Sequence, residues 1–247
     1  MTIALPLIAV LLIIPIVTYA ILARDIADPE RLMNRNNTGI ELTDIHGVEF
    51  YSSGSSKPLK RLSLDDIADP VKQAVVSSED KDFYRHSGVS LKGLIAAMYA
   101  NIANRDATAY GGSTLTQQLV KNTLLTSNKS FFRKYQELAM ALAVDRRYSK
   151  DEILDMYLNS VYYGEGAFGI DEAAKTYFGK SAAELTLAES SMLIGILPAP
   201  SAYSPLSGDA AKAKQQQSRV LRRMVEDGKI SETDKQAAET ANLQYAT

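Results

Sequence analysis

The sequence predicts a mostly α-helical domain with a short N-terminal β-hairpin, preceded by one transmembrane helix. The first observation is an uncharged apolar run from Thr2 to Ala23, long enough at about 1.5 Å per residue to cross a hydrocarbon core of about 30 Å. The second is the alternation of apolar and polar residues over Glu41 to Ser53. The third is apolar residues at helical spacing after capping residues over most of the remaining chain, without the strand and helix alternation of a doubly wound sheet.

The apolar run divides the chain into an anchor at residues 1–24, a linker at residues 25–40 and one folded domain at residues 41–247. No basic residue precedes the run and a small-x-small cleavage site is poor, so we expect an uncleaved anchor rather than a signal peptide. Three arginines follow it: Arg24, Arg31 and Arg35. The positive-inside rule would then place the domain in the cytoplasm, unless the N-terminus lies upstream or neighbouring acidic residues weaken the rule.

After the predicted hairpin, with its turn at Asp44 to Gly47, the elements are helical. Ser63 is expected to cap a first turn, and Pro70 to open a helix that runs toward Ser78. An apolar stripe lies along Leu91 to Ile102. Further N-caps are predicted at Ser113 for a helix from Thr114 to Leu125, at Ser130 for a helix from Phe131 to Tyr148, and in capping boxes at Ser149 with Glu152 and Ser181 with Glu184. Helix stops are predicted at Gly164, Gly179, Pro198 and Gly228.

Composition excludes several classes of site. The 247 residues include no Cys and 2 His, which rules out thiolate metal sites and a multi-histidine cage. The net charge of -2 argues against a globally basic nucleic-acid binder. The segment from Ser113 to Lys150, however, contains seven basic residues and two acidic ones, so its local charge is +5. This segment is either a solvated helix face or an anion site.

A glycine pattern in the second half of the chain fits the dinucleotide fingerprint G-x-G-x-x-G at Gly164, Gly166 and Gly169. That fingerprint needs a strand before it, whereas Ile153 to Tyr163 is predicted to be a helix. We therefore expect no dinucleotide cofactor, and no organic cofactor of another kind.

Three polar motifs occur in order along the domain. Glu79 and Asp80 end a predicted helix and are followed by Phe83, His86 and Gly88. Ser113, Thr114, Gln117, Gln118, Lys121 and Asn122 then mark a helix start, where free N–H groups favour anions. Finally, Arg133 and Glu137 are four residues apart on one helix face, a spacing that also suits an ordinary surface ion pair.

In this order and spacing the motifs resemble glycosyltransferase family 51, the peptidoglycan glycosyltransferases. Lys150 to Asn159 and Gly166 to Lys180 are similar to the family's fourth and fifth motifs, and the resemblance extends from Glu41 to Asp234. It implies a lysozyme-like, two-lobed helical domain with one lobe against the membrane. One departure is Gln136, where some members carry a Lys.

The resemblance implies an inverting enzyme that polymerises lipid II. The polyprenyl-pyrophosphate-linked glycan chain is transferred to the 4-hydroxyl of N-acetylglucosamine on lipid II, and polyprenyl pyrophosphate is released. The implied location is the cytoplasmic membrane, single-pass, with the domain on the extracytoplasmic side. The chain as given leaves no room for a transpeptidase domain, so we expect a monofunctional enzyme; the alternative is the glycosyltransferase part of a class A penicillin-binding protein.

The same resemblance assigns roles to residues. Glu79 and Glu137 are the expected catalytic carboxylates, with Glu137 acting through a divalent cation (Mg²⁺ or Mn²⁺) or by steadying Arg133. Expected substrate contacts are Ser113, Thr114, Gln117, Gln118, Lys121, Asn122, Lys129, Arg133 and Lys134, with helix caps or helix surface as the rival role for the hydroxyls and amides. Asp80, Phe83, His86 and Gly88 are expected to support the Glu79 loop.

The expected partners are lipid II, the growing glycan strand and the bilayer, with transpeptidases or other cell-wall synthesis proteins as further candidates and no nucleic acid. Two other functions remain open. A lysozyme-like hydrolase also uses paired carboxylates in a helical cleft, but it has no pyrophosphate for the basic segment to bind. A non-catalytic membrane scaffold would have no need of both carboxylates and the basic set.

Overall fold

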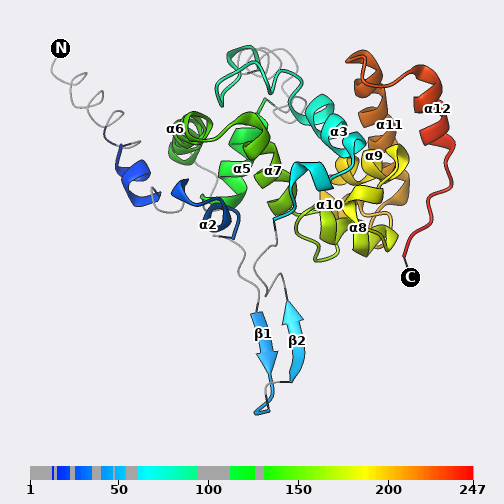
Figure 1. Cartoon of the computed structure of the whole chain (residues 1–247), viewed down its shortest axis with the longest axis horizontal. Helices are drawn as coiled ribbons and strands as arrows, with labels where there is room; N and C mark the ends of the chain where they lie inside the picture. The colour runs from blue at the N-terminus through cyan, green and yellow to red at the C-terminus, as the bar shows by residue number, and fades with distance from the viewer. Residues whose placement is uncertain are drawn as a thin grey trace. The chain divides into compact units, whose positions relative to one another are not determined.

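The fold is mostly helical in a computed structural model that describes residues 13, 16–22, 26–34, 40–46, 48–53, 61–93, 112–125 and 131–246 (Figure 1). Contacts divide the chain into two units, described separately below. Unit 1 comprises Met1–Asn36 and Phe83–Ile153, and unit 2 comprises Asn37–Asp82 and Leu154–Thr247. The division falls inside one helix, α7 (Lys150–Ser160), so that helix belongs to unit 1 at its start and to unit 2 at its end.

Unit 1 is built from α2 (Pro29–Asn34), α5 (Leu115–Thr123), α6 (Phe131–Arg147) and the first turn of α7. Helix α5 packs against α6 and also contacts α2, which lies in the segment that the sequence treats as a linker. The contacts are apolar, because Leu32 of α2 and Leu119 of α5 are fully buried, as is Ala141 of α6. Burial of such side chains is the main force that holds these helices together.

Unit 2 is arranged around α9 (Leu187–Ile196), in which every residue from Ala188 to Ile196 is buried. Helix α9 packs against α3 (Asp69–Glu79) and α11 (Ala210–Glu226), and these two also contact each other (Figure 1). The other helical elements of unit 2 are η1 (Leu64–Asp66), α8 (Ile170–Phe178), η2 (Ala182–Glu184), α10 (Pro200–Tyr203) and α12 (Glu232–Thr240). A helix that is buried on all sides is typical of a domain centre.

Strands β1 (Ile40–Thr43) and β2 (Glu49–Ser53) also belong to unit 2 and pair antiparallel, in the region where the sequence predicts two short strands. The turn between them depends on Asp44, whose carboxylate accepts hydrogen bonds from the backbone of His46 at 2.8 Å and of Val48 at 2.9 Å. An Asp side chain bonded in this way fixes a turn without help from the strands.

Several predicted helix starts are confirmed. Ser63 accepts a hydrogen bond from the backbone of Asp65, Pro70 stands in the first turn of α3, and Ser149 forms its capping box with Glu152. The glycine pattern after α7 follows a helix rather than a strand, so it lacks the setting of a dinucleotide loop.

One predicted cap is wrong in position, and one predicted capping box is confirmed but starts a shorter element than the apolar helix. The N-cap of α5 is Thr114 rather than Ser113, since Thr114 forms a complete capping box with Gln117. The capping box of Ser181 and Glu184 is present but belongs to the short turn η2. The long apolar helix that follows, α9, begins after a second box made by Thr186 and Glu189.

Part of the prediction falls on residues that the structure does not describe. These are most of the anchor at residues 1–24, the apolar stripe beyond Gly93, the cap Ser130 and the expected substrate contact Lys129. Within the described residues, none of the helices combines the length and the apolar character that crossing a membrane requires.

Candidate active site

Glu137 is the centre of a charged cluster in unit 1. Its carboxylate accepts a hydrogen bond from Arg133 Nη1 at 3.3 Å and a short one from Lys134 Nζ. Lys134 also donates to Ser113 Oγ at 3.0 Å, which ties the start of the α5 segment to α6. The predicted pair of Arg133 and Glu137 on one helix face is therefore present. Lys134, three residues before Glu137, bonds the same carboxylate. We call Arg133 and Lys134 on Glu137 the clamp.

The cluster buries its anion and leaves its cations more exposed. The Glu137 side chain is 2% exposed, whereas Arg133 is 18% and Lys134 is 39% exposed. A buried carboxylate is tolerated only when cations and hydrogen bonds replace its hydration. Two cations and one anion give the cluster a net charge of +1. Because the anion is buried, the charged groups that reach solvent are the cations. Such a cluster is suited to hold a phosphate or pyrophosphate.

The polar residues of α5 divide into two groups. Thr114 and Gln117, each 2% exposed, form the capping box, and the Thr114 hydroxyl also donates to Gly88 O at 2.6 Å. Both side chains therefore cap the start of the helix. Gln118 is half-buried, and Lys121 and Asn122 are exposed one turn further along the same helix face.

The loop that begins at Phe83 belongs to unit 1 and is packed tightly. Phe83 is fully buried, its ring lies edge-on to His86 at 6.3 Å, and Lys150 Nζ lies 4.8 Å from its centroid. Gly88 has φ of +78°, and a Cβ there would lie 2.6 Å from the carbonyl oxygen of Ala141. Only glycine meets both conditions, so the loop can lie directly on α6.

Tyr84 fixes the same loop to the start of α7. Its hydroxyl donates to Asp151 at 3.0 Å. Burial of the phenol, together with that bond to the Asp151 carboxylate, raises the pKa of Tyr84 to about 12. The phenol therefore stays protonated and remains a donor at physiological pH.

Glu79 is the last residue of α3 in unit 2 and is half-buried. Near it lies the hydroxyl of Tyr157 on α7, whose side chain is 1% exposed. Burial, followed by the charge of Glu79, raises the pKa of Tyr157 well above its ordinary value. A neutral phenol in this position contributes a dipole next to the carboxylate and no competing charge.

Helix α11 fixes the chain on both sides of Glu79. Arg223 donates a short hydrogen bond to the carbonyl oxygen of Ser78, and Lys81 forms an ion pair with Asp227. The hydrogen bond and the charge of Asp227 raise the pKa of Lys81. Asp80 is buried and its N–H donates to Val76 O at 3.0 Å, which closes the last turn of α3. The backbone that carries Glu79 is thus held by both helices.

Residues 47–225 of the chain match the model of a protein family described as transglycosylase. The chain belongs to the transglycosylase family. This confirms the resemblance to glycosyltransferase family 51 on which the predicted site residues depend.

The relatives that this chain matches include penicillin-binding proteins. The chain is 41% identical over 182 residues to penicillin-binding protein 1A of Neisseria flavescens, which covers 74% of this chain and 23% of that protein. It is 35% identical over 241 residues to penicillin-binding protein 1F of Bacillus subtilis, covering 98% of this chain and 33% of that protein. A crystal structure of penicillin-binding protein 1A from Haemophilus influenzae is similar with a TM-score of 0.49 and 21% identity, covering 85% of this chain and 22% of that chain. The chain thus spans about a quarter to a third of the length of these relatives.

The contacts of Glu137 bear on the divalent cation that the resemblance left open. Both carboxylate oxygens of Glu137 are bonded to cationic side chains of α6. The described residues also hold no cluster of three or more His, Asp or Glu side chains of the kind that binds a metal ion. The contacts of Glu137 are those of the other alternative, in which it steadies Arg133.

The predicted residues are therefore gathered in two places. Unit 1 joins Ser113, Arg133, Lys134 and Glu137 in one bonded cluster, while Glu79 and Asp80 belong to unit 2. Sequence reasoning missed the support that unit 2 gives to Glu79. Arg223 and Asp227 bear no motif of their own, and only the packing of α11 on α3 assigns them a role.

Proposed function

We propose that this chain polymerises lipid II into glycan strands. The observation that carries the proposal is the clamp of Arg133 and Lys134 on the buried Glu137, a cation-rich cluster in a member of the transglycosylase family. The reaction moves the anomeric carbon of the donor glycan from its polyprenyl pyrophosphate to the 4-hydroxyl of N-acetylglucosamine on lipid II, with inversion. Polyprenyl pyrophosphate leaves with the electron pair of the broken bond.

The acceptor hydroxyl needs a general base, and we assign this role to Glu79. A hydroxyl has a high pKa, so the base removes its proton while the new bond forms. The carboxylate of Glu79 is half-buried at the end of a helix whose last turn is closed and whose flanking residues are held by α11. A fixed base of this kind lowers the entropic cost of reaching the transition state.

The leaving pyrophosphate gains charge as the bond breaks, and cations stabilise it. We assign this role to Arg133 and Lys134, with Lys121 and Lys129 as further contacts. Glu137 orients the first two cations through its bonds to both of them. Ser113 positions Lys134 through the bond between their side chains.

The α5 residues contribute in two ways under this proposal. Gln118 and Asn122 bind sugar or phosphate oxygens, since they lie at least partly in reach of solvent. Thr114 and Gln117 keep the helix start rigid. The chain acts at the outer face of the cytoplasmic membrane, where lipid II, the growing strand and cell-wall synthesis proteins are its partners, and a divalent cation is not required by Glu137.

The rival functions are a glycan hydrolase and a non-catalytic scaffold. Hydrolysis of a neutral glycosidic bond produces no anionic leaving group, so it gives no use for the clamp of Arg133 and Lys134. A scaffold gives no use for the half-buried carboxylate of Glu79 next to a buried phenol.

The proposal is tested with Glu79→Gln and purified lipid II, with glycan strands separated on a gel. We expect the rate to fall by about 10² to 10⁴, the usual contribution of a general base, with the melting temperature unchanged. The matched control is Glu172→Gln, an exposed glutamate on α8, which keeps the wild-type rate. A Glu79→Gln enzyme that makes glycan strands at near wild-type rate disproves the assignment, and glycan cleavage by the wild type in place of synthesis disproves the function.

A further inference from the structure

Helix α12 and the segment after it form a separate attachment on unit 2. The segment runs from residue 241 to residue 246 without regular structure and returns to the end of α8 (Figure 1). We call residues 230–246 the latch. Residues 47–225 match the transglycosylase model, so the latch lies outside the matched stretch and its role has to be inferred from its contacts.

The first part of the latch is held by a small apolar cluster. Helix α12 has one buried residue, Ala238, which packs with Ala188 of α9 and Leu221 of α11. Ile230 and Leu243 of the latch are partly buried against the same cluster. By contrast, α9 is buried along almost its whole length. An element with few buried apolar contacts opens at a lower cost in free energy than the core beneath it.

The last part of the latch lies on the end of α8. The ring of Tyr245 stacks on that of Phe178, with the centroids 5.6 Å apart and the planes at 22°. The N–H of Ala246 donates to the carbonyl oxygen of Tyr177 at 2.9 Å. That carbonyl is one of the last four of α8, which have no donor within the helix. The latch therefore supplies a hydrogen bond that α8 cannot make for itself.

Gly228 separates the latch from α11 and is suited to act as a hinge. Its φ is +65°, and a Cβ there would meet nothing within 4 Å. The N–H of Lys229 donates to Met224 O at 2.9 Å, so the hydrogen bonds of α11 end before the latch begins. A glycine in open space can change its dihedral angles at little cost, so the latch can move without unfolding α11.

Tyr177 connects the latch to the turn that follows α7. Its hydroxyl donates to Tyr163 O at 2.9 Å, and a Cβ at Gly164 would lie 2.8 Å from that hydroxyl. The N–H of Ala167 donates to Gly164 O at 2.8 Å, which closes the turn. The position of Tyr177 therefore restrains the turn, and the latch holds the backbone of Tyr177.

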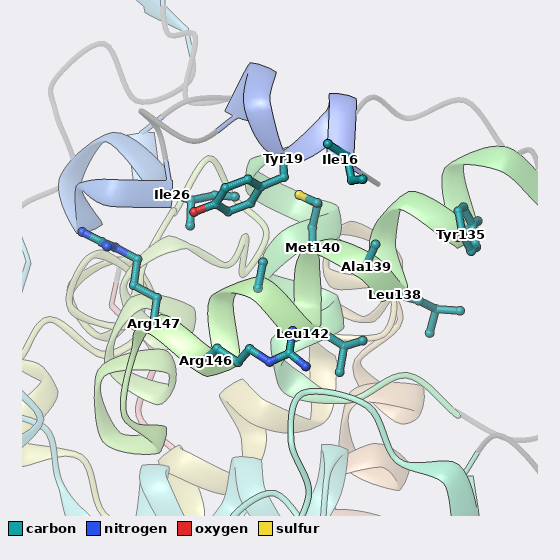
Figure 2. A pocket seen from close by; sticks show the side chains of 11 residues that line it. Ile16, Tyr19, Ile26, Tyr135, Leu138, Ala139, Met140, Leu142, Arg146 and Arg147 are labelled. Carbon is teal, nitrogen blue, oxygen red and sulfur yellow. The ribbon is translucent and has the colours of Figure 1, made fainter. Parts of the chain in front are cut away.

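The N-terminal segment of unit 1 is fastened in a different way and provides an internal reference. Three side-chain hydrogen bonds join it to α6 or to the turn after α6, from Gln136 to Thr18 Oγ1 at 2.9 Å, from Tyr148 to Ile26 O at 2.5 Å and from Arg147 to Ala27 O at 3.1 Å. A pocket of about 890 Å³ remains between this segment and α6 (Figure 2). A variant that loosens this segment disturbs a chain terminus without touching the latch.

We propose that the latch opens as one unit about Gly228 while α9 and α11 stay folded, and that its closed form holds the end of α8 and the turn after α7. Three observations in unit 2 carry the proposal: the small cluster around Ala238, the two contacts with α8, and the open hinge. The latch is a property of the folded chain, so its test does not depend on the proposed function.

The experiment is hydrogen–deuterium exchange of the full chain, followed by mass spectrometry of its peptides. We expect the peptides of residues 230–246 to share one protection factor, on the order of 100-fold lower than that of α9. Equal protection factors of the latch and α9 would overturn the proposal. Fast exchange confined to residues 241–246, with α12 as protected as α9, would also overturn it, because only the chain end would then fray.

A disulfide between the latch and α8 closes the latch reversibly. Gly179→Cys with Ala246→Cys is suitable, because a Cβ at Gly179 would lie 3.8 Å from that of Ala246 and disulfides have Cβ atoms about 3.5 to 4.5 Å apart. The natural chain has no Cys, so only this disulfide can form. Oxidation should raise the protection factor of the latch on the order of tenfold, and reduction should reverse the change. Gly179 has φ of +65°, but the strain of a side chain there is present in both redox forms and cancels.

Tyr245→Ala opens the latch without a disulfide. Loss of the stack on Phe178 should lower the protection factors of the latch and of the last turn of α8 on the order of tenfold, and leave α9 unchanged. The matched control is Gln244→Ala, an exposed neighbour in the latch. A second control is Gln136→Ala, which removes a bond of the N-terminal segment. Both controls should leave the exchange of the latch unchanged.

Thermal melting by circular dichroism checks that each variant is folded, and Tyr245→Ala with its controls decides the question if the double-cysteine variant does not fold. A Tyr245→Ala effect that extends equally to α9 contradicts independent opening. Folded protein whose two cysteines stay unlinked under oxidising conditions contradicts the placement of the latch on α8, and a disulfide that leaves the exchange unchanged contradicts the opening itself. Each of these results overturns the proposal.

Discussion

Glu137 and Glu79, the two carboxylates to which the sequence assigns catalysis, have different surroundings in the two units. Glu137 lies in the middle of α6, its side chain is 2% exposed, and it is clamped by two cations of its own helix. Glu79 lies at the end of α3, is half-buried and stands near the buried phenol of Tyr157. The Glu137 carboxylate is bonded to two cations, whereas the Glu79 carboxylate lies at a helix end near an uncharged phenol.

Surroundings of this kind separate the roles of two residues of the same type. A buried carboxylate with a cation on each oxygen is poorly placed to contact a substrate, and it orders the two cations instead. A carboxylate at the end of a helix, partly open to solvent, can exchange a proton with a substrate. Pairs of titratable groups in contrasting environments often mark such a division between chemistry and support.

The sharpest test of this contrast is Glu137→Gln. Removing the anion takes from Arg133, only 18% exposed, the carboxylate to which it is bonded, whereas Lys134 at 39% exposure can turn to solvent. We expect a loss of about 2 to 4 kcal/mol in the free energy of unfolding, toward the lower end of the range for a broken buried ion pair. The glycan polymerisation rate should also fall on the order of 100-fold as the cations lose their orientation.

Glu79→Gln is the control for that experiment. Urea denaturation should show a change within about 0.5 kcal/mol, because a half-buried residue at a helix end contributes little to the core. If both variants lose the same stability, the proposed division into a structural and a chemical carboxylate is wrong.

The clamp on Glu137 shows how far the sequence could predict this site. The spacing of Arg133 and Glu137 predicted their ion pair, since residues four apart share a helix face. The bond from Lys134 to Ser113 joins residues 21 apart and depends on how α5 packs against α6, which the sequence does not reveal. Local pairs are encoded by helical geometry, and long-range pairs need the packing.

The misplaced cap of α5 and the unpredicted capping box of α9 have a different origin, because a signal was present in the sequence. Thr114 with Gln117 and Thr186 with Glu189 both fit the capping-box pattern of Ser or Thr followed three residues later by Glu or Gln. Ser113 fits only the preference for a hydroxyl at the N-cap. A reciprocal box satisfies two backbone donors where a single cap satisfies one, so the box decides where α5 begins.

The packing of loops offers a second comparison between the units, with a smaller expected effect. Gly88 in unit 1 has φ of +78° and would place a Cβ 2.6 Å from Ala141 O, whereas Gly166 in unit 2 has φ of +76° and nothing within 4 Å. Gly166→Ala should cost about 1 kcal/mol, the conformational term alone. Gly88→Ala should cost about 2 to 4 kcal/mol, because the clash with α6 is added.

Thermal or urea denaturation measures both glycine variants, and their difference isolates the contact with α6. Equal losses of stability would mean that the loop after Phe83 can move away from α6. In that case the unit 1 loop would not be the rigid support that the sequence predicts from Phe83, His86 and Gly88.

The smallest expected effect concerns the support of Glu79 by α11. Arg223→Gln removes the bond to the carbonyl oxygen of Ser78 and leaves the Lys81 to Asp227 ion pair in place. Because Arg223 is exposed, the free energy of unfolding should change by less than about 0.5 kcal/mol. The kcat for polymerisation should fall about three- to tenfold with KM unchanged, since a small displacement of a base affects only the chemical step. The control is Arg222→Gln, whose exposed side chain pairs with Glu226 on the same helix at 3.8 Å and should leave both constants unchanged. A fall in stability without a change in kcat would make Arg223 a purely structural residue, and Glu79 would then owe its position to α3 alone.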